Sequence, residues 1–391
     1  MPVPWMDHRA QYYAIKDEVD KLIQRVLESG EYGMGEDVYA FEREFAVYCG
    51  TSYGVSVGSG SDAILLSLLA LGVGRGDEVI SVANSCWSVP LAIAHSGANI
   101  VLVDIEEQTY NIDPAKIEER ITPHTRVILA MHGHGIPCDI RAIIEIARRH
   151  DLNVLEDGSV ATGARYEGQR VASFGDVGVF SFGHGKMLTS YSNSAGIVVT
   201  NSQEIATRVR MLARYGTRPQ EGGDEVPEEY SQTGSVCAAL GYNSHLGSLQ
   251  AAILRVKLRM LDPWLEQRRA KASLYKQLLS DLPIVTPAIP ENVEPVYRGY
   301  LIRVDRRKRD EIFNELKGRG IGVRLLYLPP VHLQPAFRYL GYKEGDFPVT
   351  EKVSQEMISL PIYPELTEHQ VEEVVKALRD CVLLDGPESI I

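Results

Sequence analysis

The sequence lacks the features of a membrane protein and of a nucleic-acid-binding protein. None of its apolar runs approaches the length of a membrane span, and its first residues show no charged run followed by an apolar core. Its formal net charge is −12, whereas a protein that grips nucleic acid usually carries a basic field. We therefore expect a soluble cytoplasmic protein whose partners include neither a membrane nor nucleic acid.

Cysteine is also scarce. The chain has five cysteines, an odd number scattered without metal-ligand spacing: Cys49, Cys86, Cys138, Cys237 and Cys381. This pattern, with no leader segment, indicates reduced thiols in the cytoplasm rather than a disulfide framework. The histidines match no ligand spacing either and lack an accompanying set of carboxylates, so we expect no metal site.

The sequence does contain a long alternation of strand-like and helix-like segments. Its 391 residues are 45% hydrophobic, which suffices for a large core and two subdomains. We expect strands at 78–82, 100–103, 127–131, 152–155, 177–182 and 196–200, with helices near 113–121 and 139–150. The alternation predicts an α/β fold with a mostly parallel mixed sheet covered on both faces.

Helical patterns lie on both sides of this alternation. An apolar stripe predicts a first helix that stops at Gly30, and a glycine-rich turn at 58–62 opens a second one. The periodicity over 249–279 is long enough for one extended helix, which Pro263 should kink or break.

The last part of the chain predicts a smaller C-terminal α+β domain. It would hold a strand at 300–304, a helix at 308–318 and a final helix that starts at Thr367, where Gln370 completes a capping box. We therefore divide the chain into a large domain, 1–250, and a bridging helix with a small domain, 251–391.

Lys186 is the residue that indicates a chemistry. It follows the apolar strand at 177–182, Asp157 ends another strand about thirty residues earlier, and Ser181 lies five residues upstream. Pyridoxal phosphate needs such an arrangement: a lysine for the Schiff base and for proton transfer, and a carboxylate that keeps the ring nitrogen protonated. Judged from neighbouring residues alone, an ordinary exposed lysine fits better, so the interpretation depends on the rest of the chain.

The rest of the chain resembles a known family from about residue 5 to residue 380. The motifs that carry the resemblance are the segments 5–12, 27–35, 41–42, 70–79, 241–252 and 360–367. In this order they resemble the sugar aminotransferases of the DegT/DnrJ/EryC1/StrS type, a branch of the fold type I pyridoxal-phosphate enzymes. The opening segments are most similar to the subgroup that aminates 3-keto nucleotide sugars.

The phosphate of the cofactor has several candidate donors. A glycine-rich turn at a helix start offers free N–H groups, so we expect the backbone amides of Gly60 and Ser61 and the hydroxyl of Ser181 to bind it. The resemblance implies that Asn243 reaches the phosphate from the neighbouring subunit, and therefore a homodimer with shared active sites. Without the resemblance, Asn243 would be taken as a turn residue.

Several positions next to the cofactor depart from the family. Val160 replaces a glutamine and Thr162 a histidine, so the 3′-oxygen of the cofactor loses a donor. Cys86 stands where an aromatic residue stacks on the ring, and Trp87 can take that role if the loop shifts, although a core tryptophan is an equal alternative.

Substrate-facing positions also differ. His245 stands where the family has arginine, the His-Tyr-Pro motif is altered around Tyr327, and the loop 192–196 after the lysine is changed. His184 is a candidate for proton transfer or substrate contact, with a scaffold role as the alternative. The acidic segment 220–229 is either a lid or a loop without function.

These residues predict a pyridoxal-phosphate aminotransferase. It would move an amino group from an amino acid, L-glutamate by expectation, to a keto sugar, at C3 of a nucleotide-linked deoxysugar, with the cofactor alternating between its pyridoxal and pyridoxamine forms. Three alternatives stay open: a keto-cyclitol aminotransferase of aminoglycoside assembly, a sugar dehydratase with the same cofactor, and a relative that binds the cofactor without catalysis.

Overall fold

A computed structural model describes residues 2–217 and 236–383 of the chain. The acidic segment 220–229 lies outside the described residues. Within them, no helix is both long and apolar enough to cross a membrane.

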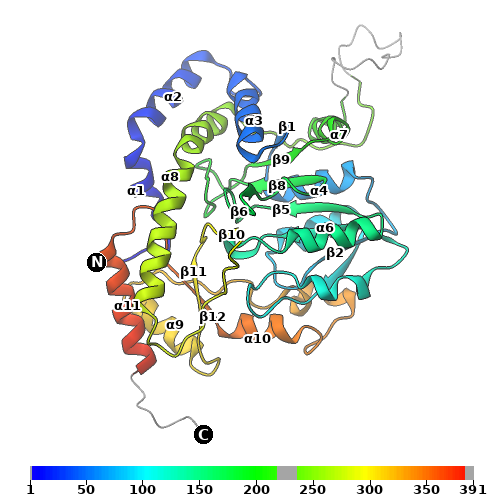
Figure 1. Ribbon diagram of the computed structural model, residues 1–391. Coiled ribbons are helices and arrows are strands. Elements are labelled where there is room, and N and C mark those ends of the chain that lie inside the picture. The colour runs from blue at the N-terminus through cyan, green and yellow to red at the C-terminus, as the bar shows by residue number, and fades with distance from the viewer. Residues whose placement is uncertain (1, 218–235, 384–391) are drawn as a thin grey trace.

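A seven-stranded sheet forms the centre of the molecule, with the strand order β1-β9-β8-β5-β4-β2-β3 (Figure 1). The neighbours from β8 to β3 are parallel, whereas β9 pairs antiparallel with both β8 and β1. The strands are β1 Tyr53–Val57, β2 Glu78–Val82, β3 Asn99–Val103, β4 Thr125–Met131, β5 Asn153–Asp157, β8 Val177–Ser181 and β9 Gly196–Thr200. The prediction of a mostly parallel mixed sheet is confirmed, and its six strands lie within two residues of their expected bounds.

Helices pack on both faces of this sheet, and its strands are therefore buried. Most positions of β4, β5, β8 and β9 are buried, as expected for continuous Val/Ile/Leu-rich runs. The covering helices are α4 Gly60–Ala70, α5 Ser88–His95, α6 Ile140–Arg149 and α7 Gln203–Ala213. The helix expected at 113–121 is wrong: the segment forms two 3₁₀ turns, η1 Pro114–Lys116 and η2 Glu118–Arg120, the first opened by Asp113 as cap.

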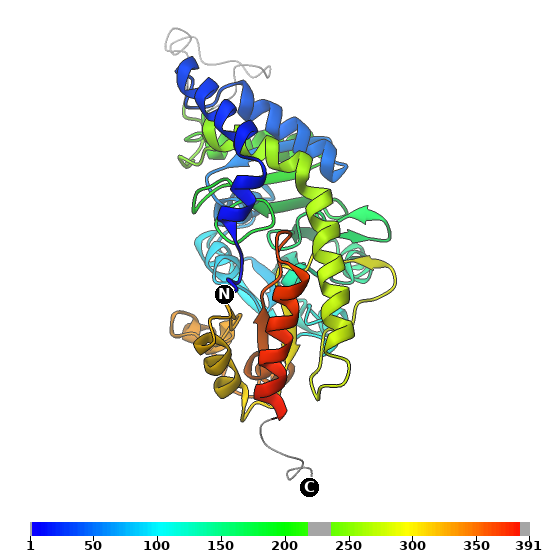
Figure 2. The same cartoon turned by 90° about the vertical axis from the view of Figure 1, so that its left-hand side faces the viewer.

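The long helix α8, Ser248–Leu278, spans the height of the molecule (Figures 1 and 2). Of the kink or break expected at Pro263, the break is absent, because the helix runs uninterrupted through this residue, and its axis bends in both views. Its first half packs against α2 Lys16–Ser29, which ends at Gly30 as predicted, and against α3 Glu36–Cys49.

A second hydrophobic core lies along the other half of α8. It contains residues of the antiparallel pair β11 Tyr300–Arg303 and β12 Met357–Leu360, with α9 Arg309–Gly318 and α11 Glu368–Leu383. The capping box at Thr367 forms as predicted, because Thr367 N–H donates to Gln370 Oε1 and Gln370 N–H donates to Thr367 Oγ1. Val3 belongs to this core and bridges to Ile321, so the first residues join the C-terminal region. The division at residue 250 stays a prediction.

Candidate active site

The carboxyl ends of β5 and β8 bring Asp157 and Lys186 together. Asp157, the last residue of β5, is 2% exposed, and its Oδ1 accepts the Ser159 N–H at 2.9 Å. Lys186 follows β8 in a tight loop in which Gly185 adopts φ 79°. Burial lowers the pKa of the Lys186 amine, the Arg298 guanidinium lowers it further, and Cys86 and Asp157 oppose the shift. The amine therefore meets the requirement of a nucleophile that is neutral more often than a surface lysine.

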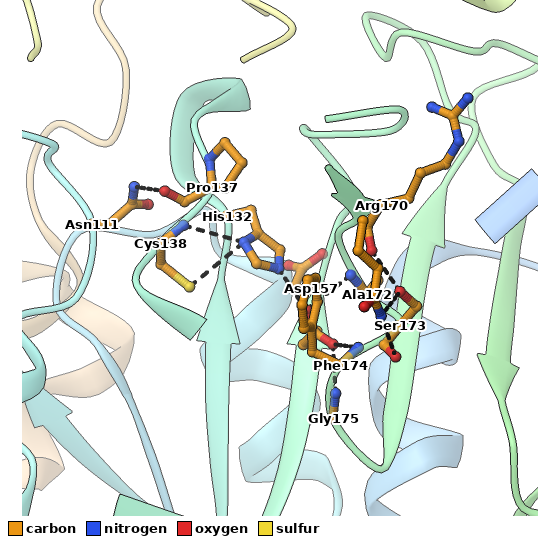
Figure 3. Close-up of polar contacts among 12 residues, drawn as sticks. Asn111, His132, Pro137, Cys138, Asp157, Arg170, Ala172, Ser173, Phe174 and Gly175 are labelled. Atoms are coloured by element: carbon orange, nitrogen blue, oxygen red, sulfur yellow. Dashed lines mark hydrogen bonds and ion pairs between the residues drawn. The ribbon is translucent and has the colours of Figure 1, made fainter. Parts of the chain in front are cut away.

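A buried polar network holds the end of β5 beneath Asp157 (Figure 3). Glu156 Oε1 accepts the N–H groups of Phe174 and Gly175 at 2.7 Å, and Oε2 accepts that of Ala172 at 2.9 Å. Oε2 also lies 3.0 Å from His132 Nε2. A buried carboxylate with four partners is fully satisfied, so it fixes the strand that carries Asp157.

His132 has a defined tautomer in this network. Its Nδ1 accepts the Cys138 N–H at 3.2 Å, so the Nε2 hydrogen is the one that points at Glu156. The backbone N–H of His132 also donates to Asp157 O at 3.0 Å. Sequence reasoning missed Glu156 and His132 as supports of the site. A charged residue inside a buried strand was the available signal, because such a residue needs partners.

The start of α4 forms a cradle beside the end of β8. Ser59 caps the helix by accepting the Asp62 N–H at 2.9 Å, and the N–H groups of Gly60 and Ser61 bond to no described residue. A Cβ on Gly60 would lie 2.5 Å from Ser181 Cβ, so only glycine lets the helix start approach Ser181 this closely. Free N–H groups, the positive helix end and a hydroxyl are the donors that a phosphate needs, and the predicted phosphate-binding residues fit the group.

Two further buried side chains lie near Arg298: Tyr327, which the sequence predicts as a substrate residue, and His134, whose part in the site sequence reasoning missed. His134 is buried, its Nε2 lies 3.4 Å from Asn84 Nδ2, and its ring packs 4.9 Å from that of Tyr327. Burial lowers the pKa of His134 to about 3, with Arg298 adding to the shift, so the imidazole is neutral. Burial raises the pKa of Tyr327 while Arg298 opposes the rise, so its hydroxyl keeps its proton.

The remaining predicted residues of the cofactor pocket have different surroundings. Val160 is buried at 3% exposure, and the buried Thr162 hydroxyl has no hydrogen-bond partner among the described residues. Trp87 is 63% exposed, whereas Cys86 is close enough to influence the pKa values of Lys186 and Tyr327. Stacking of Trp87 on the cofactor stays a prediction.

The predicted substrate residues do not gather at one place within a single chain. His184 is exposed, stacks 4.6 Å from His8, and lines a hollow of about 390 Å³ beside the lysine loop. His245 packs 6.3 Å from Tyr215. Burial and the nearby Arg214 lower the pKa of His245, so it is neutral at pH 7. Asn243 is exposed. Among residues 2–217 and 236–383, no group of His, Cys, Asp and Glu could hold a metal ion.

Comparisons with known proteins agree with this geometry. The profile of the DegT/DnrJ/EryC1/StrS aminotransferase family matches residues 13–379. The chain is 40% identical to the dTDP-3-amino-3,4,6-trideoxy-alpha-D-glucose transaminase of Streptomyces venezuelae, over 97% of this chain and 96% of that protein. It is 39% identical to a pleiotropic regulatory protein of Geobacillus stearothermophilus, over 97% and 98% of the two chains. The crystal structure of S. venezuelae DesV in complex with a ketimine intermediate superposes with a TM-score of 0.91 at 38% identity, covering 100% of both chains.

Proposed function

The chain belongs to the DegT/DnrJ/EryC1/StrS aminotransferase family, and from that premise we propose that it aminates C3 of a nucleotide-linked keto-deoxysugar with L-glutamate as donor. It is a pyridoxal-phosphate-dependent aminotransferase with a fold type I architecture. The observation that carries the proposal is the meeting of Lys186 and Asp157 at adjacent strand ends, with the N–H cradle of α4 beside Ser181.

Each of these groups has a distinct task in the proposed reaction. When bound, pyridoxal phosphate withdraws electrons from the Cα of an attached amino acid. Gly60, Ser61 and Ser181 would hold its phosphate, and the Asp157 carboxylate would favour the protonated ring nitrogen. Lys186 would hold the cofactor covalently and then, as a free amine of lowered pKa, take a proton from the donor Cα. Glu156 and His132 fix the position of Asp157, so its carboxylate would hold the cofactor ring in one orientation.

The choice of sugar is supported by the names of several relatives. Those from Streptomyces venezuelae, Aneurinibacillus thermoaerophilus and Acidithiobacillus ferrooxidans are all named as 3-amino transferases of nucleotide sugars. They are 40%, 37% and 33% identical to this chain. A keto-cyclitol acceptor would lack the nucleotide, so competition by the free nucleoside diphosphate separates the two acceptors: only a nucleotide-sugar enzyme should be inhibited.

We also propose that the chain acts in the cytoplasm as a homodimer, with Asn243 of each subunit facing the phosphate of the other site. Support comes from large apolar side chains that a single chain leaves exposed, which would otherwise face water: Trp87, Leu91, Tyr215, Leu240 and Tyr242. The free cysteines fit a reducing compartment. Sedimentation of wild type and of an Asn243→Ala variant, with cofactor content measured on both, tests the shared site: equal cofactor retention would contradict it.

The decisive experiment supplies the purified protein with pyridoxal phosphate and then L-glutamate. We expect the visible absorbance of the lysine-bound cofactor to be replaced by that of pyridoxamine phosphate, with release of one 2-oxoglutarate per site. A sugar dehydratase or a purely regulatory cofactor-binding protein would not release 2-oxoglutarate stoichiometrically. Absence of that conversion with every amino acid tried would refute the proposal.

A further inference from the structure

Arg298 is a cation beside the reactive amine that has no acidic partner among the described residues. Its Nε donates to Gly185 O at 3.4 Å, and its guanidinium lies 5.6 Å from the Trp5 ring centroid. No carboxylate of residues 2–217 or 236–383 lies within ion-pair distance of it. By contrast, Arg303, only five residues later, is paired with both Glu107 and Glu356. A half-buried arginine without a counter-ion is costly to maintain, so its partner is expected to be a bound ligand.

A second unsatisfied donor lies next to this guanidinium. The Tyr327 hydroxyl is buried and makes no hydrogen bond with any described residue, although Arg298 is close enough to affect its protonation. Tyr327 is held in place by the His134 ring at 4.9 Å and has an unusual φ of 56°, which a fixed functional position can require. Arg298 and Tyr327 together offer a cationic and a neutral donor, a combination that suits a carboxylate.

The position of Lys186 decides which anion fits. In an amino-acid donor the α-carboxylate is bonded directly to the carbon that loses its proton to the lysine, so its binding group must be a neighbour of that amine. The diphosphate of a nucleotide sugar is separated from C3 by several bonds, so its binding groups lie farther away. Arg298 donates to the carbonyl of Gly185, the residue next to Lys186, so its position matches the carboxylate of the donor.

We propose that Arg298, assisted by the Tyr327 hydroxyl, binds the α-carboxylate of the amino donor. This inference rests on the proposed aminotransferase function and assigns it a donor subsite within one chain. It also accounts for His245, because a neutral imidazole packed on Tyr215 gives no charge for a carboxylate. Specificity for amino acids over simple amines would then come from the small domain of the same subunit that supplies the lysine.

The test compares Arg298→Met with a matched control, Arg324→Met. Arg324 lies over the same Trp5 indole at 5.2 Å but is exposed and is not among the groups that act on Lys186. Titration calorimetry of the cofactor-loaded proteins with (S)-2-hydroxyglutarate, which has both carboxylates but no amine to react, measures binding alone. We expect at least about a 30-fold loss of affinity in Arg298→Met, partial recovery in Arg298→Lys, and less than about a 3-fold change in the control.

Single-turnover kinetics provide the second measurement. We expect Arg298→Met to raise the glutamate concentration needed for half-maximal conversion of the pyridoxal form by a similar factor. Conversion of the pyridoxamine form by the keto sugar should change less than about 3-fold. A loss confined to the sugar half-reaction would assign Arg298 to the phosphates and overturn the proposal, as would unchanged glutamate binding or an equal loss in both halves.

The two proposals fail in different ways. A wild type that binds (S)-2-hydroxyglutarate through Arg298 but transfers no amine would refute the aminotransferase function and leave the carboxylate site standing. A wild type that transfers amine with no dependence on Arg298 would refute the carboxylate site alone.

Discussion

Two lysines of this chain, the buried Lys257 and the part-buried Lys186, both have a lowered pKa but differ in their hydrogen-bond partners. Burial lowers the pKa of both Lys186 and Lys257, in the second case to about 7. Lys257, on α8, donates to Gln11 Oε1 at 3.0 Å and Thr189 Oγ1 at 2.7 Å, and it lies 3.7 Å from the centroid of the Tyr191 ring. Lys186, on a loop, has no hydrogen bond from its amine to any described residue. A lowered pKa is therefore common to Lys257, whose amine is satisfied by neighbouring side chains, and to Lys186, the lysine that we propose reacts, so the hydrogen-bond partners distinguish the two.

The largest expected effect comes from truncating each lysine in turn. Lys186→Ala should remove the visible absorbance of the lysine-bound cofactor and reduce turnover by at least about a thousandfold, because both the nucleophile and the proton carrier are lost. Lys257→Ala should keep the absorbance band. Spectra and single-turnover rates of the two purified variants measure the difference. A Lys186→Ala protein that kept the absorbance band and full turnover would show that Lys186 is not the lysine that binds the cofactor.

Asp157→Asn removes the carboxylate that opposes the lowering of the Lys186 pKa. Loss of a neighbouring charge changes a pKa by about 1–3 units, so we expect the rate of conversion by glutamate to fall about 10- to 1,000-fold. The fold should persist, because the asparagine can still accept the Ser159 N–H. Circular dichroism and cofactor content serve as controls. A rate within about 3-fold of wild type would mean that Asp157 does not act on the ring nitrogen.

Lys257→Met tests, through the pH dependence of stability, whether Lys257 is uncharged in the folded chain. The pKa of Lys257 is about 7 in the folded chain and 10.5 in the unfolded chain. As the pH falls from 10.5 toward 7, the unfolded chain binds a proton that the folded chain does not bind, so the free energy of unfolding decreases. Between pH 7.5 and 9.5, wild type should gain about 2 kcal/mol of unfolding free energy relative to the variant. Denaturant melts of both proteins at both pH values give the difference. Parallel pH dependences would show that Lys257 is charged in the fold.

Gly60→Ala gives the smallest expected effect on function and concerns only the proposed phosphate site. The new Cβ would displace Ser181 or the helix start, so we expect cofactor affinity to fall about tenfold and stability by about 1–3 kcal/mol. Gly74→Ala is a matched control, because a Cβ there meets no atom within 4 Å. Cofactor dissociation constants of both variants decide the point, and equal constants would exclude Gly60 from the phosphate cradle.

The parts of this site that were predictable are those close together in the sequence. Strand periodicity and the short segments around Asp157 and Ser181–Lys186 locate the amine and carboxylate, since parallel strands deliver their carboxyl ends to one edge. Arg298, His134 and Asn84 could not be predicted, because each comes from a different segment and its role depends on which partners it lacks. The continuity of α8 through Pro263 could not be predicted either, because it depends on the packing of α8 on two cores, which overrides the local preference of proline to break a helix.

The first few residues have a practical consequence for handling this protein. Val3 bridges to Ile321, and Trp5 donates to Ser359 Oγ at 3.1 Å while its indole lies beside the guanidinium of Arg298. An affinity tag fused directly ahead of these residues would lie close to Arg298, the residue that we propose binds the donor carboxylate. Purification handles and surface-immobilisation linkers are therefore better placed after residue 383 than before residue 3.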